Sequence, residues 1–299
     1  MAHAASAVEL PAPSAIAELF KPITWFPPMW AFACGVVASG QSLEGRWGLV
    51  LAGVLLAGPF VCATSQAVND WFDRHVDAIN EPHRPIPSGR MPGRWGLYLA
   101  LIWTVLSLLL STTLGPWGFG AAALGLVLAW AYSAPPVRLK RNGWWGNAAC
   151  GLSYEGLAWI TGAAVMAGGQ MPGVPSMILA LLYSLGAHGI MTLNDFKAIE
   201  GDRKMGIASL PVQLGARGAA WVACATMVLA QAAVVACLLT WHQPWHAGAV
   251  ALCVAVQLLM MRRFLAKPVA RALWLSGLGV PLYVAGMMIS AFALRAGVQ

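Results

Sequence analysis

The amino-acid sequence predicts an all-α membrane protein, a polytopic bundle of about nine transmembrane helices around a central cavity. Of the 299 residues, 59% are hydrophobic and only 10% are charged, whereas a soluble domain carries roughly a quarter charged residues. The apolar residues form long runs, and about 20 such residues are needed for one helix to cross a bilayer. No segment shows the apolar-polar alternation typical of a membrane β-barrel. Helices are therefore the expected spanning element, because they satisfy their own backbone hydrogen bonds.

Nine apolar runs are the candidates for these helices. In chain order they lie at residues 23–41, 48–69, 97–113, 117–134, 147–168, 174–193, 218–240, 245–262 and 272–294. Residues 1–20 lack the basic start and apolar core of a secretion signal. We expect them to form an N-terminal cytoplasmic segment, with a short amphipathic surface helix around Ser14–Phe20. Residues 21–299 are expected to form a single transmembrane domain.

The Lys and Arg residues are distributed unevenly between the two predicted sides of the bundle. With nine spans, the N-terminus and the loops after spans two, four, six and eight lie on one side, and that side carries 16 of the 18 Lys and Arg residues. Only Arg46 and Arg295 lie on the other side. The positive-inside rule places the basic side in the cytoplasm. Basic loops facing an anionic inner leaflet explain the net charge of +7, so we expect no nucleic-acid partner.

Acidic residues gather at two places in this apolar chain. Seven of the eleven acids fall at 70–81 and 195–202, at the cytoplasmic ends of the second and sixth predicted spans. In the first window, Asn69, Asp73 and Asp77 are spaced so that they drift by only about 40° per step and form one stripe on a helix. Asp70 points away from this stripe. Because like charges on one helix face repel, we expect a cation between the carboxylates.

A hard divalent cation suits this stripe better than the neighbouring Arg74 or His75. Mg²⁺ accepts one or two carboxylates and completes its shell with water and phosphate oxygens. The stripe is followed by a Pro-rich basic turn, "EPHRPIPSGR" at 81–90. Its Arg84 and Arg90 can each offer paired donors to a phosphate group. The first window therefore predicts a site for magnesium and a phosphate.

The second window, "NDFKAIEGDRKMG" at 194–206, repeats the Asn-Asp start of the first. Asp195 and Asp202 are seven residues apart and share a face if the helix continues through Gly201. A single acidic window at a helix end is commonly a solvated cap. Two windows with matching starts at equivalent depth favour two acidic clusters facing one cavity, each holding Mg²⁺ on a shared diphosphate.

Three stretches of the chain resemble the UbiA superfamily of intramembrane prenyltransferases. "NDWFDRHVDAINEPHRPIPSG" and "NDFKAIEGDRKMGIASLPVQLG" resemble its two acidic motifs, and "YSAPPVRLKRNGWWGN" at 132–147 resembles its basic YSxPPxxLK segment. Within these stretches, "RPIPSG", "LKRNGWWGN" and "EGDRKMGIASLPV" are most similar to the chlorophyll synthase branch, with the bacteriochlorophyll synthases favoured. The chain differs at Ala198, where many members carry a further Asp.

This resemblance implies an enzyme that transfers a C20 prenyl group, geranylgeranyl or phytyl, from its diphosphate to the propionate of bacteriochlorophyllide or chlorophyllide. Mg²⁺ is the implied cofactor. The implied partners are the prenyl diphosphate, the Mg-(bacterio)chlorin and membrane lipid, with pigment-biosynthesis or assembly proteins as further candidates. The implied location is a bacterial inner or intracytoplasmic photosynthetic membrane, with the active site facing the cytoplasm.

The resemblance also implies roles for individual residues. The catalytic set is Asp73, Asp195 and Lys140. One Mg²⁺ is assigned to Asn69, Asp73 and Asp77, and another to Asp195 and Asp202. The diphosphate contacts are Arg74, Arg84, Arg138, Lys140 and Arg203, and the substrate cavity contains Tyr132, His188 and Asn194.

Several alternatives stay open at this point. His188 lies on the same side of its span as Asp195, where it either contacts the acceptor and its central Mg or is a hydrogen-bonded core histidine. Glu155 either pairs with a neighbour, stays protonated or lies near the surface. A prenyltransferase acting on a quinone precursor or haem would use the same diphosphate machinery. An ion-coupled transporter would place its acids near the middle of the membrane, and a structural pigment-binding protein would not need two acidic motifs.

Overall fold

The computed structural model describes residues 9–297, and that part of the chain forms helices and no β-strand. The α-helices are α1 (Pro13–Phe20), α2 (Phe26–Ala38), α3 (Trp47–Leu55), α4 (Ala63–Asn80), α5 (Trp95–Ser111), α6 (Gly115–Ser133), α7 (Gly143–Gly151), α8 (Ala158–Met166), α9 (Val174–Asp195), α10 (Ile199–Lys204), α11 (Leu210–Thr240), α12 (Pro244–Ala266) and α13 (Pro268–Gly297). Short 3₁₀-helices are η1 (Pro22–Thr24), η3 (Thr112–Leu114) and η4 (Leu139–Arg141), and π-helical turns are η2 (Leu56–Cys62) and η5 (Leu152–Leu157).

Each of the nine predicted runs coincides with a helical segment of the described chain, so the predicted all-α membrane bundle is confirmed. Six segments within residues 9–297 are long and apolar enough to cross a membrane by length and composition. One of them, Trp95–Ser133, contains two of the predicted runs as α5 and α6. The first run forms only the 13-residue α2, and the fifth forms α7, η5 and α8 in succession. The nine-helix prediction is therefore roughly consistent with the structure.

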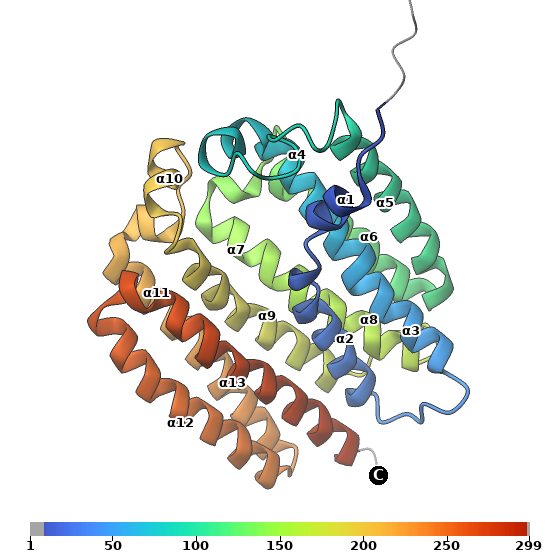
Figure 1. The fold of residues 1–299 in the computed structure, drawn as a ribbon. Helices are drawn as coiled ribbons and strands as arrows, with labels where there is room; N and C mark the ends of the chain where they lie inside the picture. The colour runs from blue at the N-terminus through green and yellow to red at the C-terminus, as the bar shows by residue number, and fades with distance from the viewer. Residues whose placement is uncertain (1–8, 298–299) are drawn as a thin grey trace, which may run out of the picture.

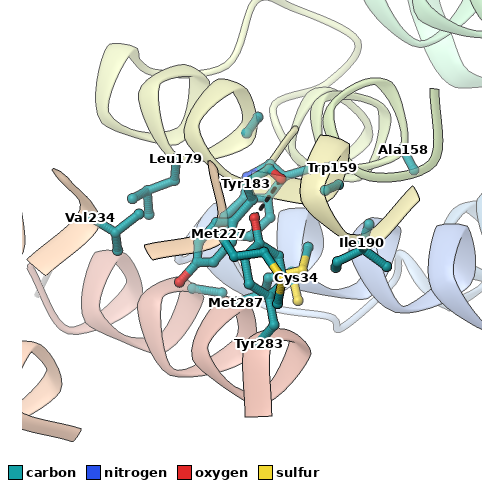
Figure 2. Packing of buried hydrophobic residues seen from close by; sticks show 14 of the residues in the cluster. Cys34, Ala158, Trp159, Leu179, Tyr183, Ile190, Met227, Val234, Tyr283 and Met287 are labelled. Carbon is teal, nitrogen blue, oxygen red and sulfur yellow. Dashed lines mark hydrogen bonds between the residues drawn. The ribbon is translucent and has the colours of Figure 1, made fainter. Parts of the chain in front are cut away.

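The main hydrophobic core lies where α9 packs against α11 and α13 and where α2 packs against α8 (Figure 1). Figure 2 shows its aromatic centre, in which Tyr183 of α9 lies next to Trp159 of α8 and Tyr283 of α13. The Tyr283 hydroxyl donates to the Tyr183 carbonyl oxygen at 2.6 Å, and the Tyr183 hydroxyl bonds to that of Ser290 at 2.7 Å. Such bonds between helices stabilise packing in a membrane, where lipid is as apolar as the core.

Helices α2 and α8 cross with their backbones almost in contact. A Cβ atom added to Gly35 would lie 2.0 Å from the carbonyl oxygen of Trp159, and one added to Gly162 would lie 2.1 Å from that of Phe32. Small residues at a crossing let two membrane helices approach closely. This crossing fixes the position of α8, and with it the position of η5 and α7 before it.

The polar elements gather at one end of the bundle. Helix α10 and the loop that follows α4 lie at the same end, whereas the C-terminus lies at the opposite end (Figure 1). The expected N-terminal amphipathic helix is present as α1, which packs against α4 and buries Ala15, Leu19 and Phe20. Residues 1–8 of the predicted N-terminal segment lie outside the described part.

Candidate active site

The predicted acidic stripe lies on α4, which continues from the π-helical turn η2 without a break. Asn69, Asp73 and Asp77 recur at helical spacing on it, as the sequence predicts. Asp70 is buried, with 2% of its surface exposed, and faces elsewhere, toward Lys21. The Lys21 ammonium lies 2.6 Å from an Asp70 carboxylate oxygen. This pair was missed from the sequence because no local spacing connects residues 21 and 70.

Asp73 is the carboxylate that meets the basic loop between α6 and α7. Arg138 approaches one of its oxygens at 3.2 Å, and Lys140 of η4 approaches the other at 2.5 Å. Only 8% of the Lys140 side chain is exposed. Burial lowers the pKa of Lys140, and the charge of Asp73 opposes that shift. The structure thus brings together three residues predicted separately, one carboxylate and two cations.

Arg84 connects the Pro-rich turn to α4 through three carboxylates. Its guanidinium lies 2.6 Å from Glu81, 2.8 Å from Asp77 and 3.6 Å from Asp70. Burial alone would lower the pKa of Arg84, but the bond to Glu81 and the charges of Asp70 and Asp77 raise it. The contacts made by Arg84 hold the turn after α4 against that helix.

The other basic residues of the two windows lie differently. Arg74 donates to the carbonyl oxygen of Trp71 at 2.7 Å, with its guanidinium 4.2 Å from the centre of the Trp71 ring. Arg90 pairs with Glu18 of α1 at 2.7 Å. Arg203 is exposed on α10. Within the described chain these three cations are not brought to Asp73, and the diphosphate role of Arg74 and Arg203 stays a prediction.

The second acidic window is split between two helices. Helix α9 ends at Asp195 and α10 begins at Ile199, so the condition for Asp195 and Asp202 to share one helix face, an unbroken helix, is not met. The break comes before Gly201, because Phe196 is buried edge-on against Phe264 of α12 and anchors a turn there. Burial raises the pKa of Asp202.

Asp195 is held by α7. The Asn147 amide donates to an Asp195 carboxylate oxygen at 3.1 Å and to the Thr192 hydroxyl at 3.2 Å. Sequence reasoning assigned no role to Asn147, although it closes the YSxPPxxLK-like segment. This bond joins α7 to Asp195 of the second window. Asn147 lies in the first turns of α7, shortly after the loop that carries Lys140.

The loop that carries Lys140 is also bonded to the segment after α10. The Gly143 amide donates to the Ala208 carbonyl oxygen at 2.8 Å, and the Ala208 amide donates to the Arg141 carbonyl oxygen at 2.9 Å. A Cβ atom on Gly143 would lie 2.6 Å from the backbone nitrogen of Leu210, so glycine is needed for this approach. The basic loop therefore contacts the first acidic window through Asp73 and, through its backbone, the segment that directly follows the second window.

A cavity of about 330 Å³ begins beside these groups. Asn69 of the first window, Asn194 of the second and Tyr132 of α6 all line it. Below them its wall is built mostly of apolar side chains from η2, α6, η5 and α8, many of them Ala or Gly. The prediction was that the acidic residues of both windows face one cavity; of these two windows, the asparagines Asn69 and Asn194 line it and the carboxylates do not.

His188 does not line this cavity. It is 8% exposed and packs against the Trp144 ring at 5.6 Å between centroids, and its Nδ1 has no hydrogen-bond partner. Glu155 is 5% exposed, and its Oε2 likewise has no hydrogen-bond partner. Polar side chains to which the sequence analysis gave no role also line the cavity, among them Cys62, Gln66 and Tyr154. The sequence feature that could have pointed to Gln66 is its spacing, because it precedes Asn69 by one helical turn.

Few carboxylates come together at any one place in the described part of the chain. No group of three or more His, Cys, Asp or Glu side chains in residues 9–297 is close enough to hold a metal ion by itself. The side chains at the two windows offer carboxylate and amide oxygens. Mg²⁺ usually binds one or two such protein ligands and completes its shell with water and phosphate oxygens. The residues present therefore fit a magnesium ion that obtains most of its ligands from substrate and water.

Comparison with known proteins agrees with this arrangement. Residues 25–278 match the UbiA prenyltransferase family. The bacteriochlorophyll synthase 33 kDa chain of Cereibacter sphaeroides is 57% identical over 286 residues, which cover 96% of this chain and 94% of that protein. The chloroplastic chlorophyll synthase of Avena sativa is 38% identical over 289 residues, covering 92% and 75%. A UbiA homolog from Archaeoglobus fulgidus, solved with GPP and Mg²⁺, has a TM-score of 0.69 at 20% identity and covers 94% of this chain and 99% of its own.

The family match extends over most of the chain, and the structural similarity extends over the whole bundle. The range matched by the family contains both acidic windows and the basic loop. The chain therefore belongs to the UbiA prenyltransferase family and is a membrane-embedded prenyltransferase.

Proposed function

We propose that the protein transfers a C20 prenyl group from its diphosphate to the propionate carboxylate of bacteriochlorophyllide. The observation that carries this proposal is the meeting of Asp73 with Arg138 and Lys140 beside an apolar cavity that both acidic windows border. Bacteriochlorophyllide is favoured over chlorophyllide because identity is 57% to a bacteriochlorophyll synthase and 38% to a chlorophyll synthase.

In this reaction the bond between the allylic carbon and the diphosphate oxygen breaks, and its electron pair leaves with the diphosphate. A propionate oxygen forms the new bond to that carbon. The propionate is already ionised at neutral pH, so no general base is needed and no proton is transferred. Lys140 and Arg138 are placed to stabilise the negative charge that develops on the leaving group.

The apolar part of the cavity is proposed to hold the prenyl chain and to exclude water from the reacting carbon. Tyr132 and Ala121 of α6 both line it, and the helix between them is about 16 Å long. Asp73, Asp195 and the basic loop lie at the end of the bundle that carries α10. We propose that this end faces the cytoplasm, since most Lys and Arg residues lie in the loops assigned to that side.

Asn69, Asp73 and Asp77 on α4, and Asp195 with Asp202, are the proposed magnesium ligands. Bound there, Mg²⁺ would neutralise diphosphate charge and so favour its departure. The residues of the chain supply few ligands to each ion, so the diphosphate has to supply others. The solved UbiA homolog with GPP and Mg²⁺ shares this fold and supports the assignment.

Removal of divalent metal is expected to stop turnover. The purified enzyme should lose activity in excess EDTA and regain it when Mg²⁺ is added beyond the chelator. Calorimetry should detect weak or no Mg²⁺ binding to the enzyme alone and clear binding once a prenyl diphosphate is present, because the diphosphate completes the ion's ligand shell. Full turnover in EDTA would contradict the metal assignment.

The proposed function is tested by supplying the enzyme with defined substrates. Membranes containing the protein are incubated with bacteriochlorophyllide or chlorophyllide and with geranylgeranyl or phytyl diphosphate, and the pigments are separated by chromatography. We expect the bacteriochlorophyllide ester to form fastest. If neither pigment is esterified while a quinone precursor or haem is prenylated, the alternative substrate class is correct.

A further inference from the structure

We propose that the Tyr154 hydroxyl, oriented by Gln66, donates a hydrogen bond to the acceptor carboxylate beside the reacting carbon of the prenyl donor. Tyr154 would then be a substrate-binding residue of the reaction, and Gln66 a positioning residue. The inference rests on the proposed function, because it takes a carboxylate as the acceptor.

The first supporting observation is the place where two irregular helical turns meet. The π-helical turns of the described chain are η2, which ends at Cys62, and η5, which contains Tyr154. They belong to different walls of the cavity, and the Cys62 sulphur lies 3.5 Å from the Tyr154 hydroxyl. Single π-turns within α-helices occur frequently at functional sites. Here two of them bring the polar side chains of Cys62 and Tyr154 together at the cavity.

The second observation is the direction of the hydrogen bond between Gln66 and Tyr154. The Gln66 amide nitrogen lies 3.0 Å from the Tyr154 oxygen. An amide NH₂ group can only donate, so the phenol oxygen accepts this bond and its own proton is left to donate elsewhere. The Cys62 thiol beside it is a weak donor directed at the same Tyr154 oxygen. Because Gln66, Cys62 and Tyr154 all line the cavity, an acceptor inside the cavity would take that proton.

The third observation is the depth in the cavity at which Gln66 and Tyr154 lie. Gln66 lies one turn, about 5 Å, below Asn69 on α4, and about 10 Å below Asp73. A diphosphate held at the level of Asp73 and Lys140 directs its reacting carbon into the cavity, toward Gln66 and Tyr154. The carboxylate that attacks this carbon must reach the same level.

A neutral donor suits this position for a chemical reason. A buried Lys or Arg would neutralise the attacking carboxylate and would be costly among apolar side chains. A phenol can orient the carboxylate and leave its charge in place. Hydrogen bonds to charged groups are worth enough to change affinity by about 10- to 100-fold, so loss of the hydroxyl should be measurable.

The test compares Tyr154→Phe with wild type, using purified enzyme, geranylgeranyl diphosphate and bacteriochlorophyllide. We expect kcat/KM for the pigment to fall by about 10- to 100-fold, mainly through a higher KM, while KM for geranylgeranyl diphosphate stays unchanged. Tyr98→Phe is the matched control, because it removes the same hydroxyl from an exposed site on α5, and it should behave as wild type.

The positioning role of Gln66 is tested by Gln66→Leu. It should weaken use of the pigment in the same way, and it should add little to the effect of Tyr154→Phe when the two are combined. Thermal unfolding of each variant verifies that it is folded. Esterification by Tyr154→Phe with wild-type KM for the pigment would overturn the inference, and so would an equal loss for both substrates. If the wild-type enzyme esterifies no pigment at all, the proposed function itself fails.

Discussion

Asp73→Asn is expected to lower kcat by about 1000-fold, while the protein remains folded and embedded in membranes. Asparagine keeps the shape of the side chain but removes the charge that Arg138 and Lys140 approach at 3.2 and 2.5 Å. It also replaces a charged magnesium ligand of the proposed site by a neutral amide, which attracts the ion less strongly. Ester formation by the purified variant, measured at saturating concentrations of both substrates, provides the test.

Glu44→Gln is the matched control for this substitution. It makes the same change from carboxylate to amide, at an exposed residue in the loop between α2 and α3, and we expect wild-type turnover. Turnover of Asp73→Asn within a few-fold of the control would contradict the assignment of the α4 stripe. Because Asp73→Asn leaves Lys140 without its counter-charge, thermal unfolding should accompany the assay to separate lost chemistry from lost stability.

Lys140→Met is expected to have the next largest effect, a loss of about 100- to 1000-fold in kcat. Methionine retains much of the side-chain length in a site where only 8% of Lys140 is exposed, so packing is largely preserved and the charge is lost. Lys140→Arg should recover part of the activity, because a guanidinium keeps the charge but presents it in a different geometry. Lys204→Met, at an exposed position on α10, is the control and should be fully active.

The same residue predicts a pH dependence. Burial lowers the pKa of Lys140, so its ammonium loses its proton at a lower pH than a free lysine does. If the charged form is the active one, wild-type kcat should fall on the alkaline side, and Lys140→Arg should shift that fall to higher pH. Identical alkaline profiles for the two enzymes would show that the charge on residue 140 does not limit the reaction.

Features that depend on local periodicity could be predicted from the sequence. The nine apolar runs and the stripe of Asn69, Asp73 and Asp77 follow from residue spacing alone, and each lies on a helix. The break between Asp195 and Asp202 could not be predicted in this way. It depends on Phe196 packing against Phe264, a contact between residues distant in the chain.

The same distinction applies to the site. Repulsion along the stripe predicted that cations would be found near the carboxylates, but spacing could not indicate that Lys140 would meet Asp73 or that Lys21 would meet Asp70. The polar pair of Gln66 and Tyr154 was missed because its two members are 88 residues apart in the chain, so no local spacing connects them.

The residues that line the cavity have one further consequence. All of them lie between Thr24 and Asn194 in the described chain, whereas α11, α12 and α13 supply much of the dense core around Tyr183 and Tyr283. Helices α11, α12 and α13 therefore support the cavity from outside and contribute no side chain to its lining. Conservative substitutions in these three helices are expected to change the stability of the bundle without changing the lining of the cavity.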